Sequence, residues 1–283
     1  MKTVKFTKMQ GIGNDYIYID CFKEKIDDPV SLAKKMSPRR FSVGADGLIL
    51  ICPSKVADAK MRMFNLDGSE GKMCGNGIRC VAKYVYDKIL KKNPLNIETL
   101  SGIKQIEVFE NDGKAETLSV NMGMPELTPQ KIPCKFTGKR MINEPVEVNG
   151  KTYNMTAVSM GNPHAVIFLD EIDELELEKI GKPFENNPLF PEKVNTEFVK
   201  IIDAKTLKMR VFERGSGETF ACGTGACAVV VAAVLNGICE KDTEITVKLL
   251  GGDLFITYKS DNSVIMRGPA KEVYSGEYYL DNL

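Results

Sequence analysis

Two short segments of this chain place a cysteine directly before a pair of glycines: Cys74-Gly75-Asn76-Gly77 and Cys222-Gly223-Thr224-Gly225. A helical pattern follows each of them, so each cysteine is expected at the N-terminus of a helix. The free N–H groups of such a terminus attract an anion, and the glycines let the backbone approach a ligand closely. The positive end of the helix is also expected to lower the pKa of the thiol. Each segment therefore predicts a reactive thiol beside a site for a carboxylate.

Two such thiols could together transfer protons on both faces of one carbon atom. If both helix ends hold one carboxylate, its α-carbon lies between the two sulfurs. One thiolate then removes the α-proton while the opposite thiol delivers a proton to the other face, which inverts the centre. The N–H groups stabilise the negative charge that develops on the carboxylate. This chemistry is racemisation or epimerisation, and it requires no metal, pyridoxal or nicotinamide.

The two segments belong to an internal repeat with a constant offset. Cys74 and Cys222 are 222 − 74 = 148 positions apart, and Gly13 and Gly161 share this offset. Further identities at the same offset are Asn14 with Asn162, Ile19 with Ile167, Met61 with Met209, Arg62 with Arg210, Phe64 with Phe212, Glu70 with Glu218, and Val81 with Val229. A period of about half the chain indicates two similar domains and not a solenoid. The repeat alone fits a purely structural duplication equally well.

The hydrophobic pattern predicts an α+β fold of two pseudo-symmetric domains, each a β-rich, barrel-like shell around one central helix. The domains are expected at 1–123 together with the C-terminal 270–283, and at 124–269. The boundary follows from the stretch 123–133, where three prolines favour a crossover. The predicted helices are 78–90 and 226–235, and the predicted strands are 4–6, 16–20, 48–51, 60–64, 103–109, 165–169, 198–202, 208–212, 244–249, 254–258 and 264–266.

The composition excludes several classes of function. Of the 283 residues, 43% are hydrophobic and 27% charged, and Lys+Arg equals Asp+Glu at 38 each. This balance argues against a broad surface for nucleic acid or anionic lipid. The single histidine, His164, excludes every metal motif that is built on a histidine pair. No signal-like segment is visible at the start, and the longest helix-like apolar run, 226–235, is too short to cross a bilayer.

The cysteines are therefore expected to be reduced thiols of a cytosolic protein. Apart from the pair described above, we interpret the others as small buried hydrophobic residues. These are Cys21, Cys52, Cys80, Cys134, Cys227 and Cys239.

One glycine pattern suggests a nucleotide cofactor but does not fit it. Gly223-x-Gly225-x-x-Ala228 matches the dinucleotide-binding fingerprint, which needs a strand directly before it. Here the loop 214–220 precedes it, and the equivalent site of the first half has Cys80 in place of the last glycine. We therefore expect no nicotinamide cofactor.

Taken together, the motifs resemble the diaminopimelate epimerase family. The matching segments are 7–16, 63–70, 73–80, 161–164, 195–198, 213–219, 221–225 and 268–270, so the resemblance spans nearly the whole chain. It implies a cofactor-independent isomerase that interconverts LL- and meso-2,6-diaminopimelate, in lysine and cell-wall precursor synthesis. It also implies a homodimer, in which Tyr274 matches a position at the dimer contact.

The resemblance assigns roles to individual positions. Cys74 and Cys222 match the paired acid and base. The positions that match ligands of the reacting end of the substrate are Asn14, Gly75, Asn76, Asn162, Gly223 and Thr224. Those that match the grip on its distal end are Asn65, Asn195 and Arg214 for the carboxylate and Glu213 for the ammonium. His164 and Glu213 match positions that tune the thiols.

Gly47 is one departure from the family pattern, because some relatives carry glutamine there. By the repeat offset it pairs with Asn195, since 47 + 148 = 195. Without a side chain, Gly47 could contribute to substrate binding only through its backbone or through water.

Two other interpretations stay open. A proline or hydroxyproline racemase of the same duplicated fold could share the cysteine pair, although it would have no use for a grip on a second amino-acid head. A thiol redox protein or a metal site is the other alternative. The chain contains no Cys-x-x-Cys motif and only one histidine, which disfavours that alternative.

Overall fold

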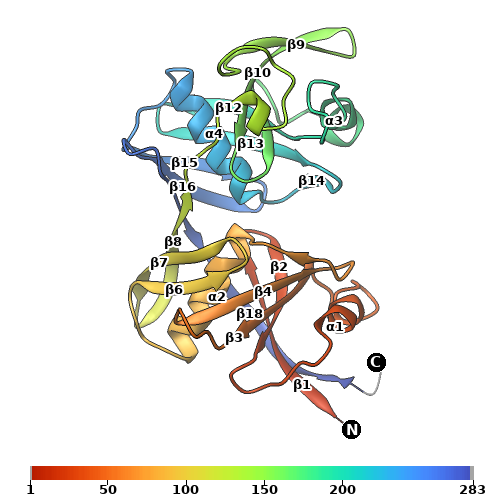
Figure 1. Ribbon diagram of the computed structural model, residues 1–283, viewed down its shortest axis with the longest axis vertical. Helices are drawn as coiled ribbons and strands as arrows, with labels where there is room; N and C mark the ends of the chain where they lie inside the picture. The colour runs from red at the N-terminus through yellow and green to blue at the C-terminus, as the bar shows by residue number, and fades with distance from the viewer. Residues whose placement is uncertain (1, 281–283) are drawn as a thin grey trace. The chain divides into compact units, whose positions relative to one another are not determined.

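The computed structural model describes residues 2–280, which divide into two compact units (Figure 1). Unit 1 contains the described residues up to Val120 and those from Gly268 onward, and unit 2 is Asn121–Arg267. The boundaries thus lie two or three residues before the predicted ones.

Unit 1 is a sheet that encloses one helix. Its elements are β1 (Thr3–Gly11), β2 (Asn14–Asp20), α1 (Pro29–Met36), β3 (Gly47–Cys52), β4 (Ala59–Asn65), β5 (Glu70–Gly71), α2 (Gly75–Lys88), β6 (Leu95–Thr99), β7 (Gly102–Asn111), β8 (Lys114–Gly123) and β18 (Lys271–Tyr279). Strand β1 pairs antiparallel with β2 and β18, β2 pairs parallel with β3, and β3 pairs antiparallel with β4. Helix α2 packs against β1, β2, β4, β6 and β7, while α1 packs against β3 and β4.

The side chains of β2 and β3 alternate between these two helices. Ile19 lies opposite Leu50 in the parallel register, and both belong to the core that α1 covers through Leu32 and Met36. Ile49, one residue away, lies beside the start of α2. A strand that is buried on both faces reads as a continuous apolar run, as β3 does.

Unit 2 repeats this arrangement. Its elements are the short 3-10 helix Pro129–Lys131, β9 (Glu144–Val148), β10 (Lys151–Ser159), β11 (Pro163–Phe168), α3 (Leu177–Glu185), β12 (Asn195–Asp203), β13 (Thr206–Glu213), β14 (Gly217–Thr219), α4 (Gly223–Leu235), β15 (Glu244–Leu249), β16 (Gly252–Tyr258) and β17 (Val264–Pro269). Strand β10 pairs antiparallel with β11, β11 parallel with β12, and β12 antiparallel with β13, as β1 to β4 do. Helix α4 packs against β10, β11, β12, β15 and β16.

The strand register shows that the repeat holds for single pairs of opposite residues. Tyr16 lies opposite Gly47 in unit 1, and His164 lies opposite Asn195 in unit 2, so both pairs obey the offset of 148. The predicted class, two α+β domains that each surround one helix, is confirmed.

The two enclosed helices begin three residues earlier than predicted, directly after Cys74 and Cys222. Glycine disfavours a helix interior, which is why the pattern placed the start later. The first turn tolerates glycine here because its N–H groups lack helical partners, and the cysteine sulfur accepts one of them. The glycines of each Cys-Gly-x-Gly segment therefore lie in the first turn of the helix.

Helix α4 is apolar on every side and almost fully buried. Gly237, with φ of +72°, follows the C-cap residue Asn236 and ends the helix. Within the described residues, no helix is long and apolar enough to span a bilayer.

Candidate active site

Cys74 is the N-cap residue of α2. Its sulfur accepts the N–H of Gly77 at 3.4 Å, and its thiol donates to Oδ1 of Asn14 at 3.3 Å. Asn14 begins β2, and its amide group donates to the Asp46 carboxylate at 2.7 Å. A partly exposed thiol and a polar side chain thus meet at the helix end.

A network of charges holds this end of β2. Asp15 contacts Lys8 at 2.6 Å and Arg39 at 2.5 Å, and Arg39 also reaches Asp46 at 2.9 Å. Burial raises the pKa of Asp15, but the hydrogen bonds from Arg39 and Lys8 outweigh it and hold the pKa below its usual value. The carboxylate that orients Asn14 is therefore itself fixed by a cation.

Cys222 is the N-cap residue of α4 and is buried. Its sulfur accepts the N–H of Gly225 at 3.3 Å and lies 3.5 Å from Oγ1 of Thr224. The two cysteines therefore have the same capping geometry in their respective units.

A buried polar cluster surrounds Cys222. Nδ1 of His164 lies 2.6 Å from Oε1 of Glu197, and Nε2 lies 3.0 Å from Oδ1 of Asn162. His164 and Glu197 are both fully buried. Ligand atoms of His164, Glu197 and Cys222 lie within 4.8 Å of one another. The second oxygen of Glu197 has no hydrogen-bond partner among the described residues.

The electrostatic environment of Cys222 differs from the expectation for a helix end. Burial raises its pKa well above the usual value, and the charges of Glu213 and Glu197 raise it further. Hydrogen bonds from Thr224 and Gly225 act in the opposite direction but are weaker. The expected lowering is therefore wrong for Cys222, which is held as the neutral thiol. Burial also raises the pKa of Glu213, whose carboxylate accepts the Thr219 hydroxyl at 2.5 Å.

The two thiols lie in different surroundings although the backbone repeats. The polar residues beside Cys222 correspond, at an offset of 148, to residues without a carboxylate or an imidazole in unit 1: His164 to Tyr16, Glu197 to Ile49 and Glu213 to Asn65. A Cβ atom built on Gly225 would lie 2.7 Å from Oε1 of Glu197, whereas one on Gly77 would lie 2.7 Å from Cδ1 of Ile49. Glu197 is thus the counterpart of an apolar side chain.

This contrast predicts how the reactivity of Cys222 depends on its neighbours. Because negative charge raises the thiol pKa, Glu197→Gln and Glu213→Gln should each move the pH profile of Cys222 alkylation to lower pH. If the thiol pKa falls by about one, the alkylation rate at a fixed pH below that pKa should rise tenfold. Mass spectrometry of the alkylated peptide measures this rate, and Glu218→Gln, on the same hairpin, is the control. An unchanged profile in both variants would show that neither carboxylate acts on the thiol.

Two other predicted residues of unit 2, Asn195 and Arg214, lie at the ends of strands. The Asn195 side chain donates to the carbonyl of Pro163 at 2.9 Å and accepts the backbone N–H of Arg214 at 2.9 Å. It therefore ties the start of β12 to the residue after β13. The Arg214 guanidinium donates to the carbonyl of Glu192 at 2.9 Å. Gly223 is buried in the first turn of α4.

In unit 1, Asn76 is buried, and its Oδ1 accepts Nη2 of Arg79 at 2.9 Å. Asn65 ends β4, and its amide donates to the Ser69 hydroxyl at 3.0 Å. Gly75 opens α2, and its carbonyl accepts Nη1 of Arg79 at 3.2 Å. The side chains of this half thus bind mainly to their own helix and turn.

Gly47 begins β3 opposite Asn65. A Cβ atom at Gly47 would lie 2.1 Å from the carbonyl oxygen of Phe64. A side chain therefore cannot enter here without a backbone shift, which accounts for glycine at this position.

The sequence assigned no role to Glu197 or Arg79, although both are fully buried. Glu197 is a carboxylate directly before the apolar residues Phe198 and Val199, and this neighbourhood was the signal available for it. The Arg79 guanidinium donates to the carbonyls of Gly75 and Pro269 at 3.2 Å each. It fixes the first turn of α2. Nothing in the sequence around Arg79 indicated this role.

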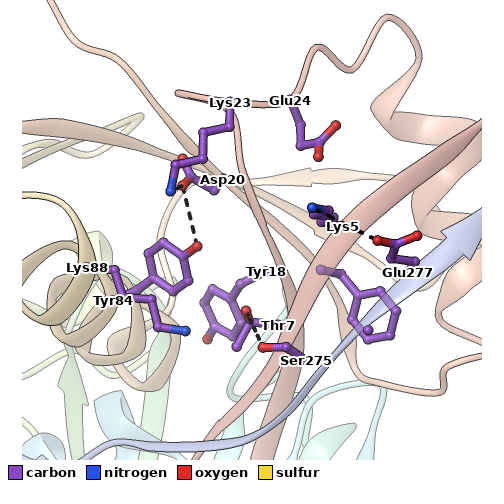
Figure 2. Close-up of a pocket in the computed structure, with 12 residues that line it drawn as sticks. Lys5, Thr7, Tyr18, Asp20, Lys23, Glu24, Tyr84, Lys88, Ser275 and Glu277 are labelled. Carbon is purple, nitrogen blue, oxygen red and sulfur yellow. Dashed lines mark hydrogen bonds and ion pairs between the residues drawn. The ribbon is translucent and has the colours of Figure 1, made fainter.

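A cavity of about 390 Å³ in unit 1 contains none of the predicted site residues (Figure 2). Two ion pairs line it, Lys23 with Asp20 at 3.1 Å and Lys5 with Glu277 at 4.0 Å. Tyr84 also donates to Asp20, at 3.4 Å. The cavity therefore lies outside the cysteine sites.

Comparison with solved structures defines the class of fold. A PhzF-family phenazine biosynthesis protein of Bacillus anthracis superposes with a TM-score of 0.69 at 17% identity, over 99% of this chain and 100% of that one. A hydroxyproline epimerase of Agrobacterium vitis gives 0.68 at 12% identity, over 98% and 91%. The protein thus has the duplicated α+β fold of these proteins.

Sequence comparison then identifies the family. The family model for diaminopimelate epimerase matches residues 6–128 and 156–273. Diaminopimelate epimerase of Acetivibrio thermocellus is 55% identical over 99% of this chain and 100% of its own length. The enzyme of the same name from Methanococcus maripaludis is 52% identical over 97% and 99%. The chain belongs to the diaminopimelate epimerase family, a family of isomerases, and the predicted resemblance is confirmed.

Proposed function

We propose that this protein converts LL-2,6-diaminopimelate to the meso form by two-base proton transfer between Cys74 and Cys222, without metal or pyridoxal phosphate. One observation carries the mechanism: each unit presents a cysteine as the N-cap of its enclosed helix, at equivalent positions of the repeat. The names of relatives that are more than half identical support the substrate. The reaction serves lysine and cell-wall precursor synthesis.

Because their surroundings differ, one thiol begins the reaction as the proton donor and the other as the base. Cys222 is buried beside two carboxylates that raise its pKa, so it begins as the proton donor. Cys74 accepts one helical N–H and is the base that removes the α-proton of the LL isomer. In the reverse direction the roles exchange. The helix-start backbone from Gly75 and Gly223 holds the reacting carboxylate and stabilises the charge that develops on it.

Polar side chains hold the rest of the substrate. Asn14 and Asn162 contact its reacting end, where each already lies beside a site residue. Arg214 pairs with the distal carboxylate, for which its planar guanidinium is suited. The distal ammonium is bound by Glu213. Asn65 and Asn195 complete the grip, together with Asn76 and Thr224 at the helix starts.

His164 and Glu197 influence the reactivity of Cys222. Their 2.6 Å contact fixes the imidazole ring, and the Glu197 carboxylate lies near the sulfur. Glu197 is a positioning residue in this proposal, because it acts through His164 and Cys222.

We also propose that the protein is a cytosolic homodimer. Strand β18 carries exposed apolar side chains at Val273, Tyr274 and Tyr279, which would be covered by a second copy. All eight cysteines are free thiols, which suits a reducing compartment. Light scattering on the native protein should give twice the mass of one chain.

The experiment that tests the reaction is a chiral assay on purified protein with LL-diaminopimelate. Activity should survive EDTA and hydroxylamine, because no metal and no pyridoxal carbonyl takes part, and a thiol alkylator should abolish it. L-Proline should not be racemised, because it offers no second amino-acid head to Arg214 and Glu213. Loss of activity to EDTA would instead favour a metal at His164, Glu197 and Cys222, whose spacing gives that alternative its one supporting observation.

A further inference from the structure

Cys21 and Cys52 lie side by side at the ends of two parallel strands. In the register of β2 and β3, Asp20 lies opposite Ile51, and the N–H of Cys21 donates to the carbonyl of Ile51 at 2.8 Å. The next position of each strand therefore brings Cys21 opposite Cys52. Neighbouring strands are about 4.8 Å apart. This spacing lies within the range of about 4.4–6.8 Å that a disulfide bridges between Cα atoms.

Both side chains point to the same face. Ile19 and Leu50 lie opposite each other one pair earlier and belong to the core under α1, and Cys21 and Cys52 pack against that same core. Both thiols are partly exposed, which corrects the expectation that they are buried hydrophobic residues. The other four cysteines of that group are buried, as predicted.

The thiols are hydrogen-bonded to each other and lie beside cationic side chains. The hydrogen bond from Cys21 lowers the pKa of Cys52, and the charges of Arg62 and Lys60 lower it further. The same hydrogen bond and burial raise the pKa of Cys21. The pair therefore resembles an attacking thiolate beside a second, resolving thiol.

The pair has no cysteine counterpart in the repeat. The equivalent positions of unit 2 are Leu169 and Lys200, since 21 + 148 = 169 and 52 + 148 = 200. The two thiols thus form a feature of unit 1 alone.

We propose that Cys21 and Cys52 form a peroxide-oxidisable dithiol, a modification site separate from Cys74 and Cys222. The Cys52 thiolate attacks one oxygen of hydrogen peroxide and becomes a sulfenic acid, and hydroxide leaves and takes up a proton as water. The sulfur of Cys21 then attacks the sulfenic sulfur, a disulfide forms, and a second water leaves. Overall, two thiols lose two protons and two electrons while one peroxide is reduced to two waters.

The disulfide would close the connection between β2 and β3. This connection contains α1 and also Arg39 and Asp46, which hold Asp15 and Asn14 beside Cys74. Closing a loop of this length restricts the unfolded chain, so the oxidised protein should melt several degrees higher than the reduced one.

Peptide mapping of the full-length protein after treatment with hydrogen peroxide tests the proposal. Trypsin should release residues 9–23 and 41–55 as one linked species that dithiothreitol separates, because each peptide holds one cysteine. In Cys21→Ser, dimedone should trap a sulfenic acid on Cys52, since the resolving thiol is missing. In the reciprocal Cys52→Ser variant, Cys21 should react much more slowly. Both reduced variants should keep wild-type epimerase activity.

Several outcomes would overturn the proposal. One is a linked peptide that forms only after the protein is unfolded in urea. Another is the absence of the link at peroxide concentrations that already oxidise Cys74 or Cys222. A third is equal trapping by dimedone in the two serine variants, which would remove the assigned order of attack.

Discussion

Replacing either Cys74 or Cys222 with alanine is expected to lower the rate of epimerisation by at least ~10²–10⁴-fold, the usual effect of losing a positioned proton-transfer group. Each variant lacks the base for one direction and the acid for the other. Substrate binding should change much less, because backbone N–H groups and the distal grip hold the substrate. Initial rates in both directions, together with calorimetric binding, separate the two effects.

The matched control is Cys239→Ala, which removes a buried cysteine away from both helix starts. It should retain near-wild-type turnover. If one of the two N-cap variants also turns over at near the wild-type rate, a single base or water performs the reaction and the paired mechanism is wrong.

The second large effect is expected from a single methyl group. In Gly225→Ala, the new Cβ would lie 2.7 Å from Oε1 of Glu197 and 3.1 Å from the sulfur of Cys222, so one of these groups must move. A displacement of about 1 Å at a reacting group can cost about 10²-fold in rate. We therefore expect a fall in kcat of this order.

Gly77→Ala is the corresponding change in unit 1. Its Cβ would meet Cδ1 of Ile49, the end of a flexible side chain, and would stay 3.5 Å from Cβ of Cys74. It should lower kcat much less than Gly225→Ala. Both variants place alanine in the first turn of a helix, so differences in helix propensity cancel. Equal losses of kcat would contradict the assigned role of the cluster around Cys222.

The fold was predictable from sequence wherever the pattern was regular and repeated. The alternating residues of β4 and β13 and the constant offset indicated two similar units, each around one helix. Helices α1 and α3 were not predicted. Each is short, and α3 contains Pro183, which interrupts a helical pattern. Their stability comes from packing on the sheet, which the local sequence does not reveal.

The candidate site was predictable to the extent that backbone motifs define it. The cysteines at the helix starts followed from the glycines beside them. The raised pKa of Cys222 did not, because it depends on burial and on Glu197 and Glu213, which belong to neighbouring strands. The role of a single buried carboxylate can be inferred only when the residues around it are known. For the same reason, the pairing of Cys21 with Cys52 needed the strand register.

The most direct test of the two-base mechanism is the isotope content of substrate and product when LL-diaminopimelate turns over in D₂O. If one thiol takes the α-proton and the other supplies the new one, early meso product carries deuterium while the remaining LL substrate stays protiated. This holds while the sulfur that took the proton exchanges slowly compared with product release. Mass spectrometry of both isomers at low conversion gives the answer. Early meso product that retains the original proton would show that one base serves both faces, and the paired-thiol mechanism would be contradicted.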